Sequence, residues 1–331
     1  MKRWEHDALE RHQIWIAFAG LTAGGSAGLF FPGIHTVFEL LVYPALAILL
    51  TCMFLQIPFG RFRRALTDRR YLVATLTTNF VVVPVVVWLL AHLAPQQPAV
   101  LLGLYLVLLA PCIDYVIVFT RLGGGDERIV LGSTPVLLVA QVLLLPGYLW
   151  LFLAESARNI IDLKPFLEAF AFLIALPLGI TLALQYLSLR YPVLGRVTDV
   201  ARWLPAPMLA LTLLVIVGSQ IVRVRSAFLD LAGIVPLYLA YQVTIGLLGP
   251  LIARAFKLDP PRGRALVFSA LTRNSLVVLP LALALPREHS LAALVIVTQT
   301  LVELTGLLAA VRIVPRLLPA CPFSASRTWR K

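Results

Sequence analysis

Charged side chains are scarce in this sequence. Asp, Glu, Lys and Arg make up 13% of the 331 residues, whereas soluble domains carry roughly a quarter. Hydrophobic residues account for 60% of the chain, and the mean hydropathy is +0.90. Too little polar surface remains to cover a water-soluble globule. The composition therefore excludes a soluble enzyme or binding domain and predicts an integral membrane protein.

Cysteine is rare as well. Cys52, Cys112 and Cys321 give no disulfide framework, and no Cys or His spacing suggests a zinc site. The sequence contains no Walker A, HExxH or GxSxG motif. The run Leu122-Gly-Gly-Gly-Asp126 lacks the Lys-Ser/Thr ending of a phosphate loop and indicates a turn. We expect no cofactor, no metal ion and no enzymatic activity.

Long hydrophobic runs dominate the sequence instead. A membrane-spanning helix needs about 20 apolar residues. Ten segments qualify, at residues 14–32, 37–57, 71–94, 98–120, 129–153, 165–188, 203–222, 229–255, 264–286 and 289–316. No A-x-A-like cleavage site follows the first of them, so we expect a retained helix rather than a signal peptide. The predicted fold is all-α, with ten transmembrane helices.

The basic residues follow an alternating pattern along these segments. Twenty-two Lys and Arg lie at the two termini and in every second connection, and five lie in the other connections. Basic residues mark the cytoplasmic side of a membrane protein, so both termini are predicted to be cytoplasmic. The net charge of +12 is therefore a topology signal, and we expect no nucleic-acid partner. Arg273 belongs to neither set, because it lies inside the ninth segment.

Ten segments divide naturally into two halves of five. A five-helix unit repeated in sequence must be inverted in the membrane, as is common among secondary transporters. We expect a cytoplasmic N-terminal segment, a first five-helix repeat, an external linker, a second five-helix repeat and a cytoplasmic tail, at residues 1–13, 14–153, 154–164, 165–316 and 317–331. An offset of 161 residues between the halves aligns Cys112 with Arg273 and Asp114 with Ser275, and brings Gln141 within one position of Glu303.

The fourth and ninth segments are both interrupted. In the fourth, Pro111 removes an amide donor and clashes with the preceding turn, just before Cys112 and Asp114. In the ninth, the polar run from Ser269 to Ser275 interrupts the aliphatic residues. Paired interruptions in corresponding helices are the best sequence indication of a transporter's binding site. We expect these two broken helices to cross near the middle of the membrane.

Depth along the segments brings three unusual residues to one level. At about 1.5 Å per residue, Cys112 and Glu303 lie roughly 20 Å in from the outside and Arg273 about 15 Å in from the inside. A charge at this depth costs about 2.5–3.5 kcal/mol, so it faces a partner or a cavity. Asp114, two residues after Cys112, likewise needs a partner or a cavity.

Each of these residues has a purely structural alternative. Cys112 can be a small buried hydrophobic side chain, and Arg273 can form a buried ion pair with Asp114 or Glu303. In the functional interpretation Cys112, Arg273 and Asn274 bind the substrate. Glu303, with Asp114, would exchange protons, because burial favours the neutral form of a carboxyl group. Further polar or helix-breaking residues are predicted to line the pathway, namely Pro111, Thr272, Ser275, Gln141 and Asn79.

The motif Ala110-Pro-Cys112, followed by Gly125-Asp126, resembles the arsenite efflux carriers of the bile acid:sodium symporter superfamily. The run Leu301-Val-Glu303 in the tenth segment is similar to the same family. The resemblance implies a ten-helix fold in which helices 3–5 and 8–10 form a core that moves against a panel of helices 1, 2, 6 and 7. It also implies efflux of arsenite or antimonite across the inner membrane, with Cys112 and Glu303 essential.

Two departures from this family bear on the coupling ion and the substrate. The family's ninth helix usually reads like Asn-Asn-Phe-Glu, where this chain has Thr272-Arg-Asn-Ser275. An arginine can take the place of a sodium ion, so we expect proton coupling. Relatives usually have a small neutral residue where this chain has Asp114. An added Asp–Arg pair leaves open an organic-anion substrate, with proton or sodium coupling, and the oligomeric state is also open.

Overall fold

A computed structural model describes residues 16, 19–31, 33–56, 68–113, 115–153, 176–188, 190–191, 194–195, 203–226, 231, 233–283 and 291–319. These residues form helices and connecting segments. Two of the connecting segments also pair like antiparallel strands, through an isolated bridge between Pro111 and Arg273. Asp114, predicted to lie in the fourth segment, and Cys321 fall outside the described residues, as do the predicted linker at 154–164 and residues 1–13 at the N-terminus.

Helices occur in each of the ten hydrophobic segments. The first holds helical residues 19–30. The following segments hold α2 (Ile34–Gln56), α4 (Arg69–Thr77) with the π-helix η2 (Thr78–Val82) and α5 (Val83–Ala91), α6 (Pro98–Leu108) with α7 (Val116–Leu122), α8 (Glu127–Phe152), α11 (Leu176–Ser188), α13 (Pro205–Ser226), α15 (Val235–Ala255), α16 (Pro260–Leu271) with α17 (Ser275–Leu283), and α18 (Leu291–Leu317).

Five of these helical stretches are long and apolar enough to cross a membrane. They are Ile34–Leu55, Arg69–Ala91, Glu127–Phe152, Val235–Ala255 and Leu291–Leu317. Large hydrophobic side chains on three of them point outward, with Leu40 77%, Leu143 71% and Val243 61% exposed. Water would penalise such surfaces, whereas lipid would not. The chain is an all-helical, multi-pass membrane protein, while the full count of ten spans in two repeats stays a prediction.

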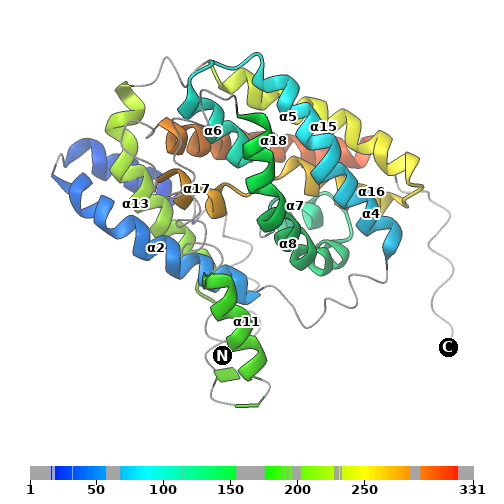
Figure 1. Cartoon of the computed structure of the whole chain (residues 1–331), viewed down its shortest axis with the longest axis horizontal. Helices are drawn as coiled ribbons and strands as arrows, with labels where there is room; N and C mark the ends of the chain where they lie inside the picture. Colours follow the sequence, from blue (N-terminus) through cyan, green and yellow to red (C-terminus); the bar gives the residue numbers. More distant parts are fainter. Residues whose placement is uncertain are drawn as a thin grey trace.

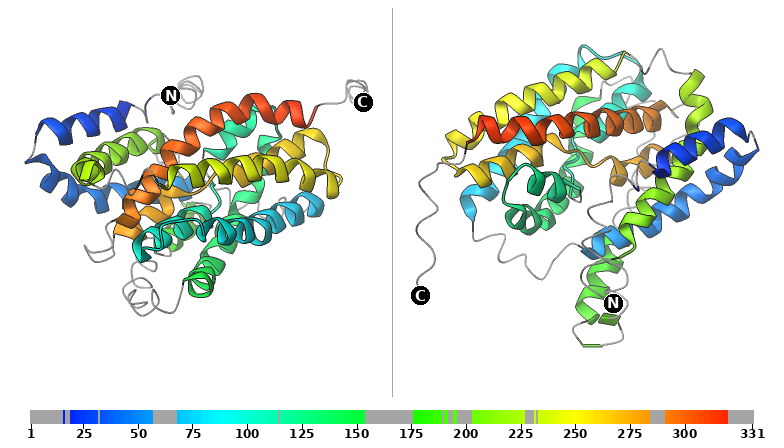
Figure 2. Two further views of the ribbon diagram at one scale, coloured as in Figure 1. Left: turned by 90° about the horizontal axis from the view of Figure 1, so that it is seen from above. Right: turned by 180° about the vertical axis from the view of Figure 1, so that it is seen from behind.

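The helices form two groups, which Figures 1 and 2 show side by side. In the first group α2 packs along α13 and α11, and residues 19–30 approach α13 closely, since a Cβ on Gly24 would lie 2.2 Å from the Leu214 carbonyl oxygen. In the second group α6 packs on α18, and α15 packs on α16 and α18. This division matches the panel and core that the family resemblance implies.

Helix bounds in the second half of the chain follow those in the first. Adding the offset of 161 to α8 gives 288–313, against Leu291–Leu317 for α18. The same shift takes α6 to 259–269, against Pro260–Leu271 for α16, and α7 to 277–283, against Ser275–Leu283 for α17. The bounds of the two broken helices thus differ by a few residues at most under this offset. The pair of repeats itself stays a prediction.

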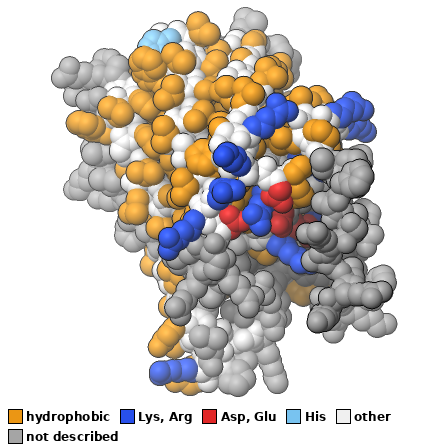
Figure 3. All heavy atoms as spheres, turned by 90° about the vertical axis from the view of Figure 1, so that its right-hand side faces the viewer, with side chains coloured by type: hydrophobic (Ala, Val, Ile, Leu, Met, Phe, Trp, Pro, Cys, Tyr) orange, Lys and Arg blue, Asp and Glu red, His pale blue; other side chains and the backbone are white. Residues whose placement is uncertain are grey.

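Three connections predicted to be cytoplasmic meet at one end of the second group. Arg262 pairs with Asp68 at 3.0 Å, which joins the start of α16 to the start of α4. The amide of Asp126 donates to the Pro261 carbonyl at 3.0 Å, and Arg264 donates to the Gly124 carbonyl at 3.0 Å. Figure 3 shows charged side chains gathered in one region of a surface that is otherwise largely hydrophobic. The run of three glycines forms the predicted turn, with Gly124 at φ 64°.

Candidate functional site

The two helix breaks lie against each other. Helix α6 ends at Leu108, α16 ends at Leu271, and the extended segments that follow run antiparallel. The amide of Cys112 donates to the Thr272 carbonyl at 3.2 Å, and the amide of Asn274 donates to the Ala110 carbonyl at 2.8 Å. Each unwound segment thus satisfies polar groups of the other, as the hydrocarbon region requires. The predicted crossing of the fourth and ninth segments is therefore a short strand-like pair.

The guanidinium group of Arg273 binds the carboxyl ends of both half-helices. Its Nη1 donates to the Leu108 carbonyl of α6 at 3.3 Å. Its Nη2 donates to the Ser269 and Ala270 carbonyls of α16 at 3.0 and 2.6 Å. The last carbonyls of a helix lack partners within the helix and carry about half a negative charge. Two helix ends together therefore balance one buried guanidinium.

Asn79 supplies a fourth acceptor to the Arg273 guanidinium. Its Oδ1 accepts from Nη2 at 2.7 Å, while its Nδ2 donates to the Ser269 hydroxyl at 3.2 Å and to the Thr75 carbonyl at 3.1 Å. Asn79 lies in the π-helix η2, a widened turn of the kind that often occurs at functional sites. The widened turn occurs where the third segment reaches the crossing.

Glu303 of α18 is fully buried beside the crossing. Its Oε2 accepts from the Arg273 main-chain amide at 3.0 Å and from the Gln299 side chain. Its Oε1 lies 2.7 Å from the hydroxyl of Tyr115. The contact between Glu303 and Arg273 is therefore made through the backbone. Among the described residues no carboxylate forms an ion pair with the guanidinium, in contrast to the predicted alternative of an Arg273–Glu303 pair.

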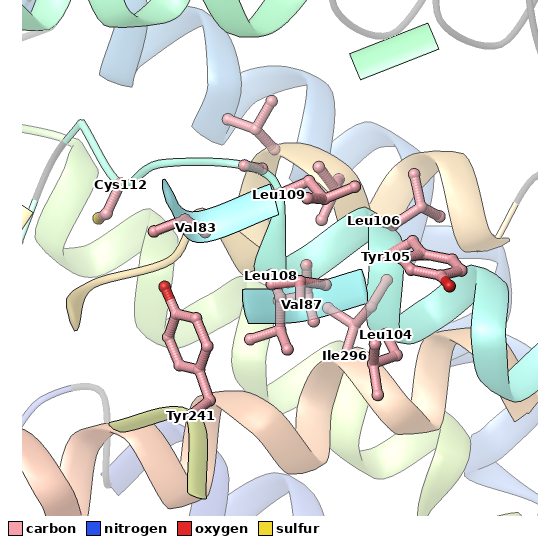
Figure 4. Close-up of a cluster of buried hydrophobic side chains, with 14 of the residues drawn as sticks. Val83, Val87, Leu104, Tyr105, Leu106, Leu108, Leu109, Cys112, Tyr241 and Ile296 are labelled. Carbon is pink, nitrogen blue, oxygen red and sulfur yellow. The ribbon is translucent and has the colours of Figure 1, made fainter. Parts of the chain in front are cut away.

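Cys112 is buried on the segment that follows α6 and belongs to the same buried cluster as Val83, Leu108 and Tyr241 (Figure 4). The thiol is free of any disulfide. The Cys112 amide donates a hydrogen bond to the Thr272 carbonyl. Arg273, which follows Thr272, donates from its own amide to the Glu303 carboxylate. The structure therefore brings Cys112, Arg273 and Glu303 to a single crossing, which Cys112 joins through its main-chain amide. Cys52, interpreted as a packing residue, is buried in α2.

Several buried polar atoms at the crossing have no hydrogen-bond partner. Asn274 caps α17 by accepting from the Val277 amide at 3.3 Å, and its Nδ2 is left unpaired. The Ser275 hydroxyl and the Arg273 Nε are also unpaired. Burying such groups without partners is costly, so they are candidates for contact with a polar ligand. Gln141 of α8 is buried, with an unpaired Oε1.

Tyr115 belongs to this site but was not predicted from the sequence. The Tyr115 hydroxyl lies 2.7 Å from Glu303 Oε1 and 2.8 Å from the Arg273 carbonyl oxygen. A polar ring directly after the helix break was the signal that could have revealed it. A tyrosine among aliphatic residues is common in membrane helices, so its position alone did not distinguish it.

Comparison with known protein families matches residues 43–226 to the Sodium Bile acid symporter family. The matched region is more than half of the chain. It contains the break at Cys112 and the π-helix η2, and it ends before Arg273 and Glu303. No curated protein matches the chain.

Proposed function

Because the chain belongs to the Sodium Bile acid symporter family, whose members are transporters rather than enzymes, we propose that it exports arsenite or antimonite in exchange for protons. The observation that carries this proposal is the crossing itself. Cys112 and Glu303 are bonded to Thr272 and Arg273, two consecutive residues of one unwound segment. A cysteine residue and the carboxyl group of Glu303 are therefore each one hydrogen bond away from the same unwound segment.

The thiol suits the proposed substrate. Arsenite at neutral pH is an uncharged trihydroxide, and soft thiolate is the ligand that soft metals and metalloids prefer. The Cys112 sulfur replaces one hydroxyl group on arsenic, and water is the other product. One sulfur holds arsenic less tightly than three would, which permits release on the far side. The unpaired Asn274 Nδ2 and Ser275 hydroxyl can bind the remaining oxygens.

The position of Arg273 supports proton coupling over sodium coupling. In transporters with broken helices, unwound carbonyls and half-helix carboxyl ends coordinate the coupling cation. Here those groups bind the guanidinium, at Leu108, Ser269 and Ala270. A tethered cation leaves no place for a sodium ion. Glu303 is then the group that takes a proton from one side and releases it on the other.

The transport cycle we propose is alternating access in a ten-helix fold of two inverted repeats. The core, with α4–α8 and α15–α18, moves against the panel that contains α2, α11 and α13 and carries the crossing between the two sides. Both termini are cytoplasmic in an inner membrane, in accord with the excess of basic residues there and with the charged end of the core. The surrounding partner is lipid.

Everted membrane vesicles test this function. In vesicles acidified inside, arsenite should accumulate, and one proton moving down about 100 mV supports roughly fiftyfold accumulation. Replacing sodium by N-methylglucamine should leave the uptake unchanged, and collapsing the proton gradient should abolish it. Arsenite uptake that persists without a proton gradient, or that needs sodium, would contradict proton exchange.

Glu303→Gln separates coupling from binding. The amide keeps the size of the side chain but cannot carry a proton. We expect the proton-driven accumulation to fall to a ratio near one, while exchange of labelled for unlabelled arsenite continues. Glu127→Gln is the matched control, since Glu127 pairs with Arg121 at the surface of α8. A Glu303→Gln protein that still accumulates arsenite under a proton gradient would remove Glu303 from the coupling step.

The second candidate function is proton- or sodium-coupled transport of an organic anion. Its support is the set of unpaired donors at Arg273 Nε, Asn274 Nδ2 and Ser275 Oγ, next to the amino end of α17. Such an end attracts anions. Transport of a carboxylate or sulfonate that is lost in Arg273→Ala and retained in Cys112→Ser would favour this function over arsenite export.

A further inference from the structure

Tyr115 faces two acceptors with one proton to give. Its hydroxyl oxygen lies 2.7 Å from Glu303 Oε1 and 2.8 Å from the main-chain oxygen of Arg273. A phenol hydroxyl donates one hydrogen bond, and its oxygen can accept another. A carboxylate and a carbonyl only accept. When Glu303 is ionised, both acceptors therefore compete for the same proton.

Protonation of Glu303 resolves this competition. The carboxyl O–H then donates to the Tyr115 oxygen, and the Tyr115 hydroxyl is free to donate to the Arg273 carbonyl. Oε2 keeps both of its donors, the Arg273 amide and Gln299. All partners in the chain from Glu303 through Tyr115 to Arg273 are satisfied in this arrangement.

When Glu303 loses its proton, the hydrogen bond between Glu303 and Tyr115 reverses its direction. Tyr115 then donates to the charged carboxylate, because hydrogen bonds to an ionised group are about twice as strong as neutral ones. The Arg273 carbonyl loses that donor. This carbonyl is in the same peptide group as the Asn274 amide, which donates to the Ala110 carbonyl where the two broken helices pair. A change of charge at Glu303 thereby reaches the pairing of the two half-helices.

We infer that Tyr115 is the positioning residue that couples the protonation of Glu303 to the contact between the fourth and ninth segments. This inference rests on the proposed function, in which Glu303 carries the coupling proton. Among the described residues, the other charged or titratable groups that act on Glu303 are the Arg273 guanidinium, bound to helix carboxyl ends, and Tyr241 of α15, whose hydroxyl donates to the Ala270 carbonyl at 2.8 Å. Neither of these side chains is within hydrogen-bond distance of both acceptors.

Infrared difference spectroscopy on the purified protein in lipid vesicles tests this without any substrate. The difference between wild type and Glu303→Gln identifies the carbonyl band of the protonated Glu303 carboxyl. In Tyr115→Phe this band should move to higher frequency, because the carboxyl O–H loses its acceptor. Tyr238→Phe is the matched control. Tyr238 is buried, and its hydroxyl donates to the Val295 carbonyl of α18 at 2.9 Å, away from Glu303.

A second measurement needs no change at Tyr115. The C–O stretching band of tyrosine reports whether the hydroxyl donates or accepts. With isotope-labelled tyrosine, wild type should show a pH-dependent change in this band that is absent in Glu303→Gln. The inference would be overturned if the carboxyl band did not shift in Tyr115→Phe. It would also be overturned if the tyrosine band changed with pH in the same way in wild type and Glu303→Gln. Both spectra are independent of arsenite, so a shifted band in a protein that moves no arsenite would contradict the proposed substrate and leave Tyr115 in its role.

Transport assays measure the functional effect of losing the Tyr115 hydroxyl. Proton-driven uptake by Tyr115→Phe should fall at least about tenfold, the lower end of the change that a hydrogen bond to a charged group carries. Arsenite–arsenite exchange should be preserved, because Cys112 and its bond to Thr272 are untouched. Equal losses in both assays would indicate a merely structural role for the tyrosine and would contradict the coupling.

Discussion

Arg273→Ala should be the most destabilising single substitution at the crossing, and sodium should partly restore the lost stability. Removing the guanidinium leaves four buried oxygens without this donor, those of Leu108, Ser269, Ala270 and Asn79. An unsatisfied buried acceptor costs about 1–3 kcal/mol. Together with the cavity, the loss should reach at least about 3–5 kcal/mol of unfolding free energy.

Sodium distinguishes this prediction from ordinary damage to packing. All four oxygens are hard ligands, and three of them are carbonyls at half-helix carboxyl ends, the kind of group that coordinates sodium in other transporters. Thermal unfolding in detergent should therefore show that sodium stabilises Arg273→Ala relative to N-methylglucamine, while wild type is indifferent. Arg264→Ala is the matched control. Arg264 also donates to main-chain carbonyls, those of Gly124 and Leu318, but at the edge of the core. If sodium also stabilised the wild type, the interpretation that the Arg273 guanidinium takes the place of a sodium ion would be contradicted.

The broken helices could be predicted because their causes are visible in the sequence. Pro111 cannot continue a helix, and the charge of Arg273 cannot face lipid. The same applies to Glu303, whose depth along α18 followed from counting residues. The predicted alternative for Arg273 was an ion pair with a carboxylate. Among the described residues its guanidinium partners are instead the Asn79 side chain and three main-chain carbonyls, and main-chain carbonyls leave no trace in the sequence.

Tyr115 and the π-helix η2 were not predicted, for a related reason. Their roles depend on where the fourth, ninth and tenth segments cross in space, and hydrophobic periodicity does not give that. Asn79 was predicted to line the pathway, but its bond to Arg273 depends on the widened turn at Thr78–Val82. Gln141 was predicted to line the pathway because it is a polar residue within a hydrophobic segment. It is buried in α8, with no hydrogen bond to the crossing residues among those described.

Cys112→Ser should abolish arsenite transport while leaving the fold intact. Serine is close in size to cysteine, and the bond from the residue 112 amide to the Thr272 carbonyl does not involve the side chain. The hydroxyl is a hard ligand that does not bind soft arsenic as a thiolate does. If the thiol were only a packing group, the cost would be a small loss of stability with transport retained. The two interpretations of Cys112 thus predict opposite results.

The most direct test measures arsenite uptake into acidified everted vesicles with wild type, Cys112→Ser and Cys52→Ser at equal amounts in the membrane. Cys52 is the matched control, because it is also buried and outside any disulfide but lies in α2, away from the crossing. We predict that wild type and Cys52→Ser accumulate arsenite and that Cys112→Ser falls to the level of vesicles without the protein. Uptake by Cys112→Ser equal to that of wild type would contradict arsenite binding at the crossing.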